Sequence, residues 1–406
     1  MFEGILFSLF LSLAPPYPSP QKPVVVSKTD VNERFLLQVS YEQENGLQDF
    51  MTSRSRVVDF KRQGKVLQMV EEPHDSGTRR HLLATLPIRS ETAQVLIVDF
   101  NAGFDRIFEE EDRTGEDYDG RVDTHDYSFV RLSQRQILSV SQRGPLLVLD
   151  QKALDTHLKP VLVHYYLSPY RPNPNFQPFE IENLHHFGFY ETYPQRRSGR
   201  TVLYAMKFDS QKPIVFALSA AIPDRYRQAV RDGVLYWNEA LGRPLLQVID
   251  APDDVAAPSP RYNVIQWLAD GDFASTSHIQ GDPLTGEILH AHIFVLSRSM
   301  KQGDLDEQND HLRYVVAHEV GHALGLRHNF AKGPVSTVMN YFMFKQTVKI
   351  GHDVIRSGGK ALDYDRKVMR HVYFDEPLDL DALPTFCTDG QARCDPLTSR
   401  SLPPFK

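Results

Sequence analysis

One run of residues, His318-Glu-Val-Gly-His-Ala-Leu-Gly-Leu-Arg-His328, constrains the fold of this chain more than any other stretch. Two histidines four residues apart on a helix lie on one face, so the imidazoles of His318 and His322 can reach the same metal ion. Glu319 lies beside His318, where its carboxylate can contact a metal-bound water without being a ligand. The run therefore predicts a helix that carries a metal site.

Gly325 determines whether a third histidine joins that site. If the helix continued, His328 would lie about 9 Å beyond His322 along the axis, too far to share the ion. Glycine can take the left-handed conformation that ends a helix and turns the chain back. Three neutral imidazoles, from His318, His322 and His328, leave a fourth position open for water, which is the catalytic arrangement of Zn2+. The alternative is a helix that carries histidines on its surface.

A second motif, Ser336-Thr-Val-Met-Asn-Tyr341, follows the third histidine. With the H-E-x-x-H-x-x-G-x-x-H pattern, it makes the chain similar to the metzincin metalloproteases. The resemblance implies that Met339 belongs to the Met-turn, packed beneath the imidazoles without being a ligand. It also implies that Tyr341 contacts the zinc or the reaction intermediate. The sequence around His328 and Met339 is closest to a group of large bacterial secreted or envelope zinc metalloproteases, in which Asn340 is more often Asp.

These residues predict a zinc-dependent endopeptidase that acts on proteins or peptides. Zinc lowers the pKa of its bound water to about 7. Glu319 is the expected general base, which takes the water proton and passes it to the leaving amine. Tyr341 is expected to stabilise the oxyanion. Two other classes stay open: a catalytically weak, zinc-bearing binding module of the cell envelope, and a zinc hydrolase of glycans or esters.

The length of 406 residues allows two domains of ordinary size, and 41% hydrophobic residues can build their cores. A net charge of −7 without a basic stripe argues against a nucleic-acid partner. No apolar run is long enough to predict a transmembrane span. The oligomeric state is not predicted by any of these features.

Residues 5–14 form a short apolar run that precedes Pro15 and Pro16. This arrangement is typical of a signal-peptide core, so residues 1–20 are predicted to be a signal peptide. Export to the periplasm, cell envelope or extracellular space follows, with a misplaced start codon or a buried strand as alternatives. Cys387 and Cys394 are close enough in sequence to form a bridge that fits an oxidising compartment, or they are two free thiols.

We expect an α+β chain in which a β-rich N-terminal domain at residues 24–170 precedes the peptidase domain. Residues 171–200 are rich in proline and are predicted to be a linker. The basic cluster Arg196–Arg200 within them is either a maturation cleavage site or an exposed loop. Residues 201–376 form the predicted metzincin-like domain, with a twisted mixed sheet, an active-site helix, the Met-turn and a C-terminal helix. Residues 377–406 are predicted to be an irregular tail.

Residue patterns place the individual elements of both domains. In the first domain, strands are expected at residues 34–39, 57–60, 65–70, 95–100 and 146–149. In the second, strands are expected at 201–208, 213–218, 261–268 and 286–296, and helices at 223–240, at 307–324 and from Asp363.

His290 and His292 alternate on one face of the last of these strands. An exposed face with surface histidines is the expected explanation, and a second metal site is the alternative. The metzincin resemblance makes residues 288–295 a candidate edge strand that pairs with the substrate backbone.

Overall fold

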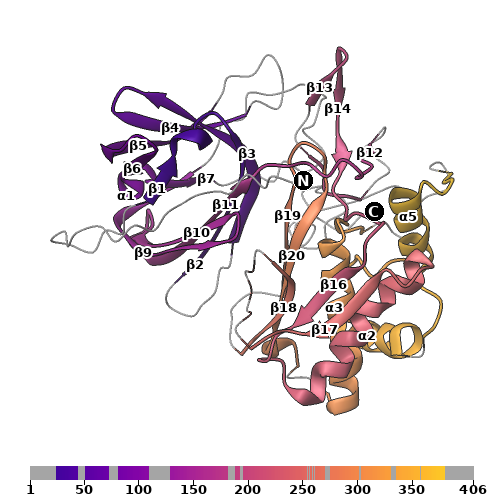
Figure 1. The fold of residues 1–406 in the computed structure, drawn as a ribbon. Coiled ribbons are helices and arrows are strands. Elements are labelled where there is room, and N and C mark those ends of the chain that lie inside the picture. The colour runs from indigo at the N-terminus through magenta and orange to yellow at the C-terminus, as the bar shows by residue number, and fades with distance from the viewer. Residues whose placement is uncertain are drawn as a thin grey trace, which may run out of the picture. The chain divides into compact units, whose positions relative to one another are not determined.

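The computed structural model describes most of the chain between Val24 and Asp379. The described residues are 24–43, 51–72, 81–108, 129–181, 188–192, 195–253, 255, 257, 259, 261–269, 275–300, 303–330, 335–356 and 358–379. The predicted signal peptide, both cysteines and most of the predicted tail lie outside them. The described residues form two compact units, the first up to Pro174 and the second from Asn175 onward (Figure 1). Within the described residues, no helix is long and apolar enough to cross a membrane.

The first unit is built on a nine-stranded, fully antiparallel sheet with the strand order β1-β6-β5-β4-β3-β2-β11-β10-β9. The strands are β1 (Val24–Ser27), β2 (Arg34–Gln43), β3 (Met51–Gln63), β4 (Val66–Glu71), β5 (Leu82–Glu91), β6 (Val95–Val98), β9 (Ser133–Arg143), β10 (Leu146–Leu154) and β11 (Pro160–Pro169). A smaller pair joins β7 (Arg106–Phe108) to β8 (Phe129–Arg131), and η1 (Lys28–Asp30) and α1 (Phe100–Gly103) are short helices. The strands expected at five places are present, and the sequence pattern missed β1, β5, β7, β8, β9 and β11.

Helix α1 shows that this sheet curls around one core. It contacts both β5 and β9, which lie far apart in the strand order. The rings of Phe100 and Phe104 stack at a centroid distance of 4.0 Å, and Phe104 meets the buried Tyr165 of β11 edge-on at 4.6 Å. Aromatic pairs of this kind add to the free energy of burial. The first unit is therefore held together by side chains from both ends of its sheet.

The second unit contains a five-stranded mixed sheet with the order β17-β16-β18-β20-β19. Its strands are β16 (Ile214–Leu218), β17 (Leu246–Asp250), β18 (Asn263–Leu268), β19 (Thr276–Gly281) and β20 (Ile288–Leu296). All neighbours are parallel except β19 and β20. The edge strand next to β20 is thus β19, so the expectation that residues 288–295 form the edge was wrong. The polar sequence of β19 carries no alternation of apolar residues that would predict a strand.

Two long helices, α2 (Asp224–Leu241) and α3 (Leu305–Ala323), pack against the same face of this sheet (Figure 1). Trp237 of α2 is fully buried, and its indole Nε1 donates to the Ala317 carbonyl of α3 at 2.8 Å. A buried indole N–H that finds an acceptor avoids the cost of an unpaired donor. This contact fixes α3 next to α2 at the level of His318.

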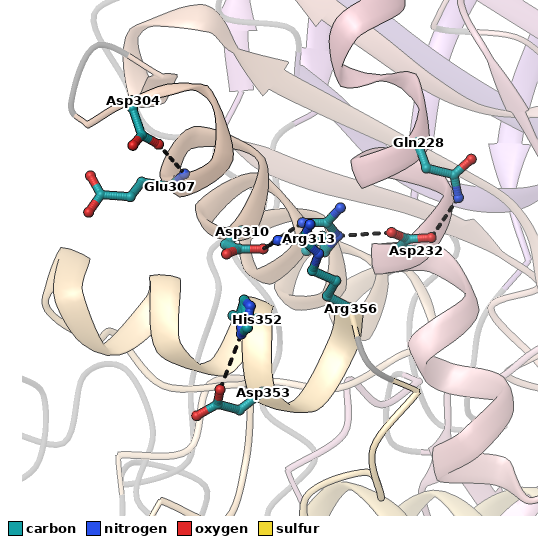
Figure 2. Close-up of polar contacts among 9 residues, drawn as sticks. All are labelled: Gln228, Asp232, Asp304, Glu307, Asp310, Arg313, His352, Asp353 and Arg356. Atoms are coloured by element: carbon teal, nitrogen blue, oxygen red, sulfur yellow. Dashed lines mark hydrogen bonds and ion pairs between the residues drawn. The ribbon is translucent and has the colours of Figure 1, made fainter.

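A buried charge chain ties the first half of α3 to its neighbours (Figure 2). The Arg313 guanidinium donates to Asp232 of α2 at 2.8 Å and to Asp310 of α3 at 2.6 Å. Arg356 lies 3.9 Å from the same Asp310 carboxylate. Arg313 and Asp310 are the buried members, so removing either would weaken the pairing of the other buried charge, which is costly. Asp304 caps the helix by accepting from the Glu307 N–H at 3.0 Å.

The remaining elements of the second unit are short, apart from the last helix. They are β12 (Phe179–Glu180), β13 (Gln195–Arg197), β14 (Arg200–Val202), β15 (Tyr204–Ala205), η2 (Ser297–Met300), α4 (Phe344–Ile350), the π-helical turn η3 (Gly351–Arg356) and α5 (Asp363–Phe374).

The predicted linker at residues 171–200 is mostly part of the second unit. β12 pairs with β15, and β13 forms a hairpin with β14 around a turn at Ser198 and Gly199. The linker prediction failed here because strands of two or three residues leave no periodic pattern. The basic cluster Arg196–Arg200 forms this hairpin.

His290 and His292 do not form the exposed face that the sequence suggested. His292 is fully buried and its Nε2 accepts from the Ser259 N–H at 3.3 Å. His278 of β19 lies opposite His292 in the sheet register. Burial lowers the pKa of His278 and of His290 to about 4 and that of His292 to about 3. Within the described residues, these histidines do not form a metal-binding group.

These depressed pKa values predict a loss of stability in mild acid. A histidine in an unfolded chain has a pKa of about 6.5, so between about pH 6.5 and 4 the unfolded state binds more protons than the folded state. The contribution of these three histidines to the free energy of unfolding should therefore fall as the pH drops through this window, by up to about 1.4 kcal/mol per pH unit for each histidine. Urea unfolding of the wild type and of His292→Gln at several pH values measures the slope.

His352, which is 56% exposed, provides the matched control. The His292→Gln variant should lose part of the acid dependence, and His352→Gln should keep all of it. Equal slopes for the wild type and His292→Gln would contradict the assignment.

Candidate metal centre

The three predicted ligands converge at the end of α3. The Nε2 atoms of His318, His322 and His328 form a triangle with edges of 3.0, 3.1 and 3.2 Å. Zinc–nitrogen bonds of about 2.0–2.1 Å in a tetrahedral site place such nitrogens about 3.3 Å apart. The triangle thus has the size of one face of a zinc coordination sphere. Within the described residues, this is the group that could hold a metal ion.

Hydrogen bonds on the far side of two rings fix their protonation. His318 Nδ1 lies 2.7 Å from the Val338 carbonyl, and His322 Nδ1 lies 2.7 Å from the Leu326 carbonyl. A carbonyl only accepts, so each Nδ1 carries the proton and each Nε2 presents a lone pair. These two lone pairs face each other at 3.2 Å. No proton lies between them, so a cation is the group that fits the space.

Electrostatics keep the central ligand neutral. Burial, with the neighbouring His328 and His318, holds the pKa of His322 well below its usual range. A neutral imidazole is the form that binds metals. Both the tautomer and the charge of His322 therefore suit a ligand.

The chain turns back after α3 at Gly325, as the sequence predicted. α3 ends at Ala323, and Gly325 has a φ of 104°. A Cβ at this position would lie 2.0 Å from the Met206 carbonyl oxygen. Any side chain here is excluded both by the dihedral angle and by the neighbouring backbone. The turn brings His328 into reach of the two helical ligands.

Met339 lies beneath α3 and is fully buried. A Cβ on Gly321, between the two helical ligands, would lie 2.2 Å from the Met339 sulfur and 2.7 Å from Trp237. The absence of a side chain at Gly321 therefore lets the methionine approach the helix backbone closely. Met339 thus lies against the ligand helix at Gly321, and its packing beneath the imidazoles stays a prediction.

Asp365 of α5 holds the segment before Met339 in place. Its fully buried carboxylate accepts from the Tyr236 hydroxyl at 2.7 Å, the Thr337 hydroxyl at 2.6 Å and the Val338 N–H at 2.9 Å. Burial raises the pKa of Asp365 to about 6. The Val338 carbonyl is the partner of His318, so Asp365 acts on the first ligand through one residue, Val338. This role has no signal in the sequence, because one Asp in an amphipathic helix is typical of a surface residue.

Glu319 is 5% exposed and follows His318 directly on α3. Burial raises the pKa of Glu319 to about 8. A nearby cation favours the ionised form of a carboxyl group and lowers its pKa again. A metal bound by the three histidines would therefore lower the pKa of Glu319, so that its ionised form can accept a proton near neutral pH.

Tyr341 lies over the third ligand and is 43% exposed. Its ring centroid is 4.4 Å from that of His328, and its hydroxyl is 3.4 Å from His328 Nδ1. An O–H donor at this distance makes a weak hydrogen bond at best. The hydroxyl of Tyr341 is thus close to the site without being strongly bound there.

Comparison with known proteins supports the metal centre. A family model described as Met-zincin matches residues 301–349, which hold α3, the three histidines and Met339. No curated protein matches the chain. Among solved structures, the odorant binding protein OBP1 is 9% identical, covers 37% of this chain and 79% of its own, and has a TM-score of 0.18. The ywiB protein from Bacillus subtilis is 8% identical, covers 36% and 96%, and has a TM-score of 0.16. TM-scores this low carry no argument about this protein.

The hydrogen bonds of Asp365 predict a specific cost for Asp365→Asn. All three groups around the carboxylate donate to it, so an amide N–H₂ would face at least one donor. Leaving a buried donor without an acceptor costs about 1–3 kcal/mol. Chemical unfolding at neutral pH should show this loss relative to the wild type. Asp363→Asn on the exposed side of the same helix is the control, and an equal effect of both changes would contradict the role of Asp365.

Proposed function

Residues 301–349 are a metzincin segment, and on this basis we propose that the protein is a zinc-dependent endopeptidase. The observation that carries the proposal is the pair of imidazole lone pairs of His318 and His322, which face each other at 3.2 Å beside His328. A cation placed between these acceptors would relieve the repulsion of their lone pairs. Three histidines with one open position are the ligand set of catalytic zinc.

Bound zinc supplies a water of lowered pKa and polarises the scissile carbonyl. The protein's own residues supply the rest. The carbonyls of Val338 and Leu326 orient the two helical imidazoles, which makes those imidazoles better ligands. The fixed geometry of the three nitrogens means that little rearrangement is needed when the ion binds.

Glu319 is the proposed general base. It follows His318 directly on α3, and we propose that its carboxylate contacts the metal-bound water without being a ligand. It accepts a proton from the attacking water and delivers it to the leaving amine. The Tyr341 hydroxyl is the proposed donor to the oxyanion, because it lies beside His328 and is exposed to an incoming substrate.

The edge strand β19 supports a peptide as substrate. β19 is the last strand of its sheet and is in contact with α3. An extended peptide can add to such an edge through backbone hydrogen bonds, largely independent of its side chains. This mode of binding suits a protein or peptide chain better than a glycan or an ester. We also propose export from the apolar run at residues 5–14.

A catalytically weak binding module is the second candidate function. It shares the metal and lacks turnover, so the fate of Glu319 variants separates the two. A module whose zinc is structural should bind its partner equally well with or without the Glu319 carboxylate.

Glu319→Ala should retain zinc and the fold while losing hydrolysis. The loss of a positioned general base lowers the rate by about 10²–10⁴-fold. His322→Ala should lose the zinc itself, because a metal ligand is removed. Casein hydrolysis, zinc content and circular dichroism of the purified proteins measure these effects. 1,10-Phenanthroline should stop the wild type, and zinc should restore it. Hydrolysis by Glu319→Ala at the wild-type rate would refute the proposed mechanism.

Tyr341→Phe keeps the ring over His328 and removes only the hydroxyl. If the hydroxyl stabilises the oxyanion, kcat should fall by up to about 10³-fold. The affinity for zinc should change little, because the hydrogen bond to His328 Nδ1 is long. Steady-state kinetics with a peptide substrate and a chelator competition assay give the two values. An unchanged kcat would show that Tyr341 contributes only its ring.

A further inference from the structure

Residues 188–192, within the segment expected to be a linker, form a short extended segment with two isolated β-bridges, and this segment lies beside the turn that carries His328. On one side, Phe189 pairs with Leu326. The Tyr190 N–H donates to the Gly325 carbonyl at 2.7 Å, and the Arg327 N–H donates to the Gly188 carbonyl at 2.6 Å. These bonds cover the residues from the helix end up to the third ligand.

The other side of residues 188–192 makes hydrogen bonds to the rest of the second unit. Glu191 pairs with Ala205, and the Met206 N–H donates to the Tyr190 carbonyl at 2.7 Å. The Thr192 N–H donates to the Tyr204 carbonyl at 2.9 Å. Residues 188–192 therefore lie between β15 and the ligand turn, and the turn reaches β15 through them.

Side chains reinforce this attachment. Glu191 accepts from Arg327 at 2.7 Å, and the two side chains are 19% and 7% exposed. The Arg327 guanidinium also lies over the Tyr190 ring, 5.3 Å from its centroid. Phe189 is 1% exposed and lies against Gly325. A buried guanidinium that loses its carboxylate partner must shift or stay unpaired, and Arg327 is the residue directly before His328.

His328 lies outside the helix that carries the other two ligands. His318 and His322 belong to α3, whereas His328 follows the turn after the helix end. The backbone on both sides of His328 is held by hydrogen bonds. The Arg327 N–H donates to the Gly188 carbonyl at 2.6 Å, and the Asn329 N–H donates to the Met339 carbonyl at 2.7 Å.

We infer that residues 188–192 position the third metal ligand, and that Glu191, acting through Arg327, is a positioning residue for His328. The inference rests on the proposed zinc site. It assigns to a segment ahead of the recognisable metzincin sequence a direct part in building the metal centre. Glu191 does not contact the metal or the substrate, so its effect should appear in the affinity and geometry of metal binding.

The test is Glu191→Gln in the full-length protein. The change removes the charge at constant shape, which loosens Arg327 and the turn. Zinc affinity, measured by competition with a chromophoric chelator, should fall about tenfold, at the lower end of the range for groups that orient ligands. The visible spectrum of the Co2+-substituted protein should lose intensity, because it reports how well the three nitrogens form a tetrahedral site.

Glu180→Gln is the matched control. Glu180 forms an ion pair with Arg200 in the same part of the chain. Both side chains of this pair are more exposed than those of Glu191 and Arg327. This control should leave zinc affinity and the Co2+ spectrum at wild-type values. The double variant Glu191→Gln/Arg327→Met should bind zinc no more weakly than the worse single variant, because both changes break one contact.

Three outcomes would overturn the inference. The first is a Glu191→Gln variant whose zinc affinity stays within twofold of the wild type and whose Co2+ spectrum is unchanged. This result would show that residues 188–192 do not position His328, even if the variant had lower thermal stability. An equal loss in Glu180→Gln would show a general effect of the segment. A wild type that binds no zinc would refute the proposed function and this inference together, whereas a zinc-binding wild type with a normal Glu191→Gln refutes the inference alone.

Discussion

The Nε2 lone pairs of His318 and His322 face each other at 3.2 Å, and the surrounding residues of the second unit hold them in this position. Without a cation between them they repel, and each ring would turn away if it were free to do so. The carbonyls of Val338 and Leu326 prevent this by holding the opposite nitrogens. The protein thus meets the cost of assembling the ligands during folding. An ion that arrives finds the site already formed, which is the usual way for a protein to gain affinity by preorganisation.

Each support of this site comes from a different part of the chain. Trp237 of α2 donates to the ligand helix, Asp365 of α5 holds Val338, whose carbonyl contacts His318, and Met339 fills the space under Gly321. Residues 188–192 join the ligand turn to β15. The metal centre therefore closes contacts between segments far apart in sequence. Loss of one support is felt at the ligands because the interior is close-packed and transmits small shifts.

The sequence predicted the parts of this arrangement that repeat with a regular spacing. The histidines on α3, the helix end at Gly325 and the main elements of both units follow from periodicity and from glycine's conformational freedom. Other parts have no local signal. β19 is polar along its length, and Asp365 looks like a surface residue. Residues 188–192 are extended only because Leu326 and Ala205 pair with them on either side. His292 looked exposed because the loop residue that covers it, Ser259, is distant in sequence. Tertiary contacts decide such positions, and no window of sequence contains them.

The hairpin of β13 and β14 has a consequence for how the chain can be divided. Its turn at Ser198 and Gly199 is exposed, and it lies between residues 188–192 and β15, which pair with each other. A proteolytic cut in this turn would leave both new ends anchored in neighbouring strands, so the upstream piece would stay attached without a covalent bond. A recombinant fragment that begins at residue 201 is a different molecule. It carries every histidine of the metal centre but lacks residues 188–192, which lie beside the turn that leads to His328. A boundary placed before Asn175 keeps residues 188–192, β15 and the turn of the third ligand in one fragment.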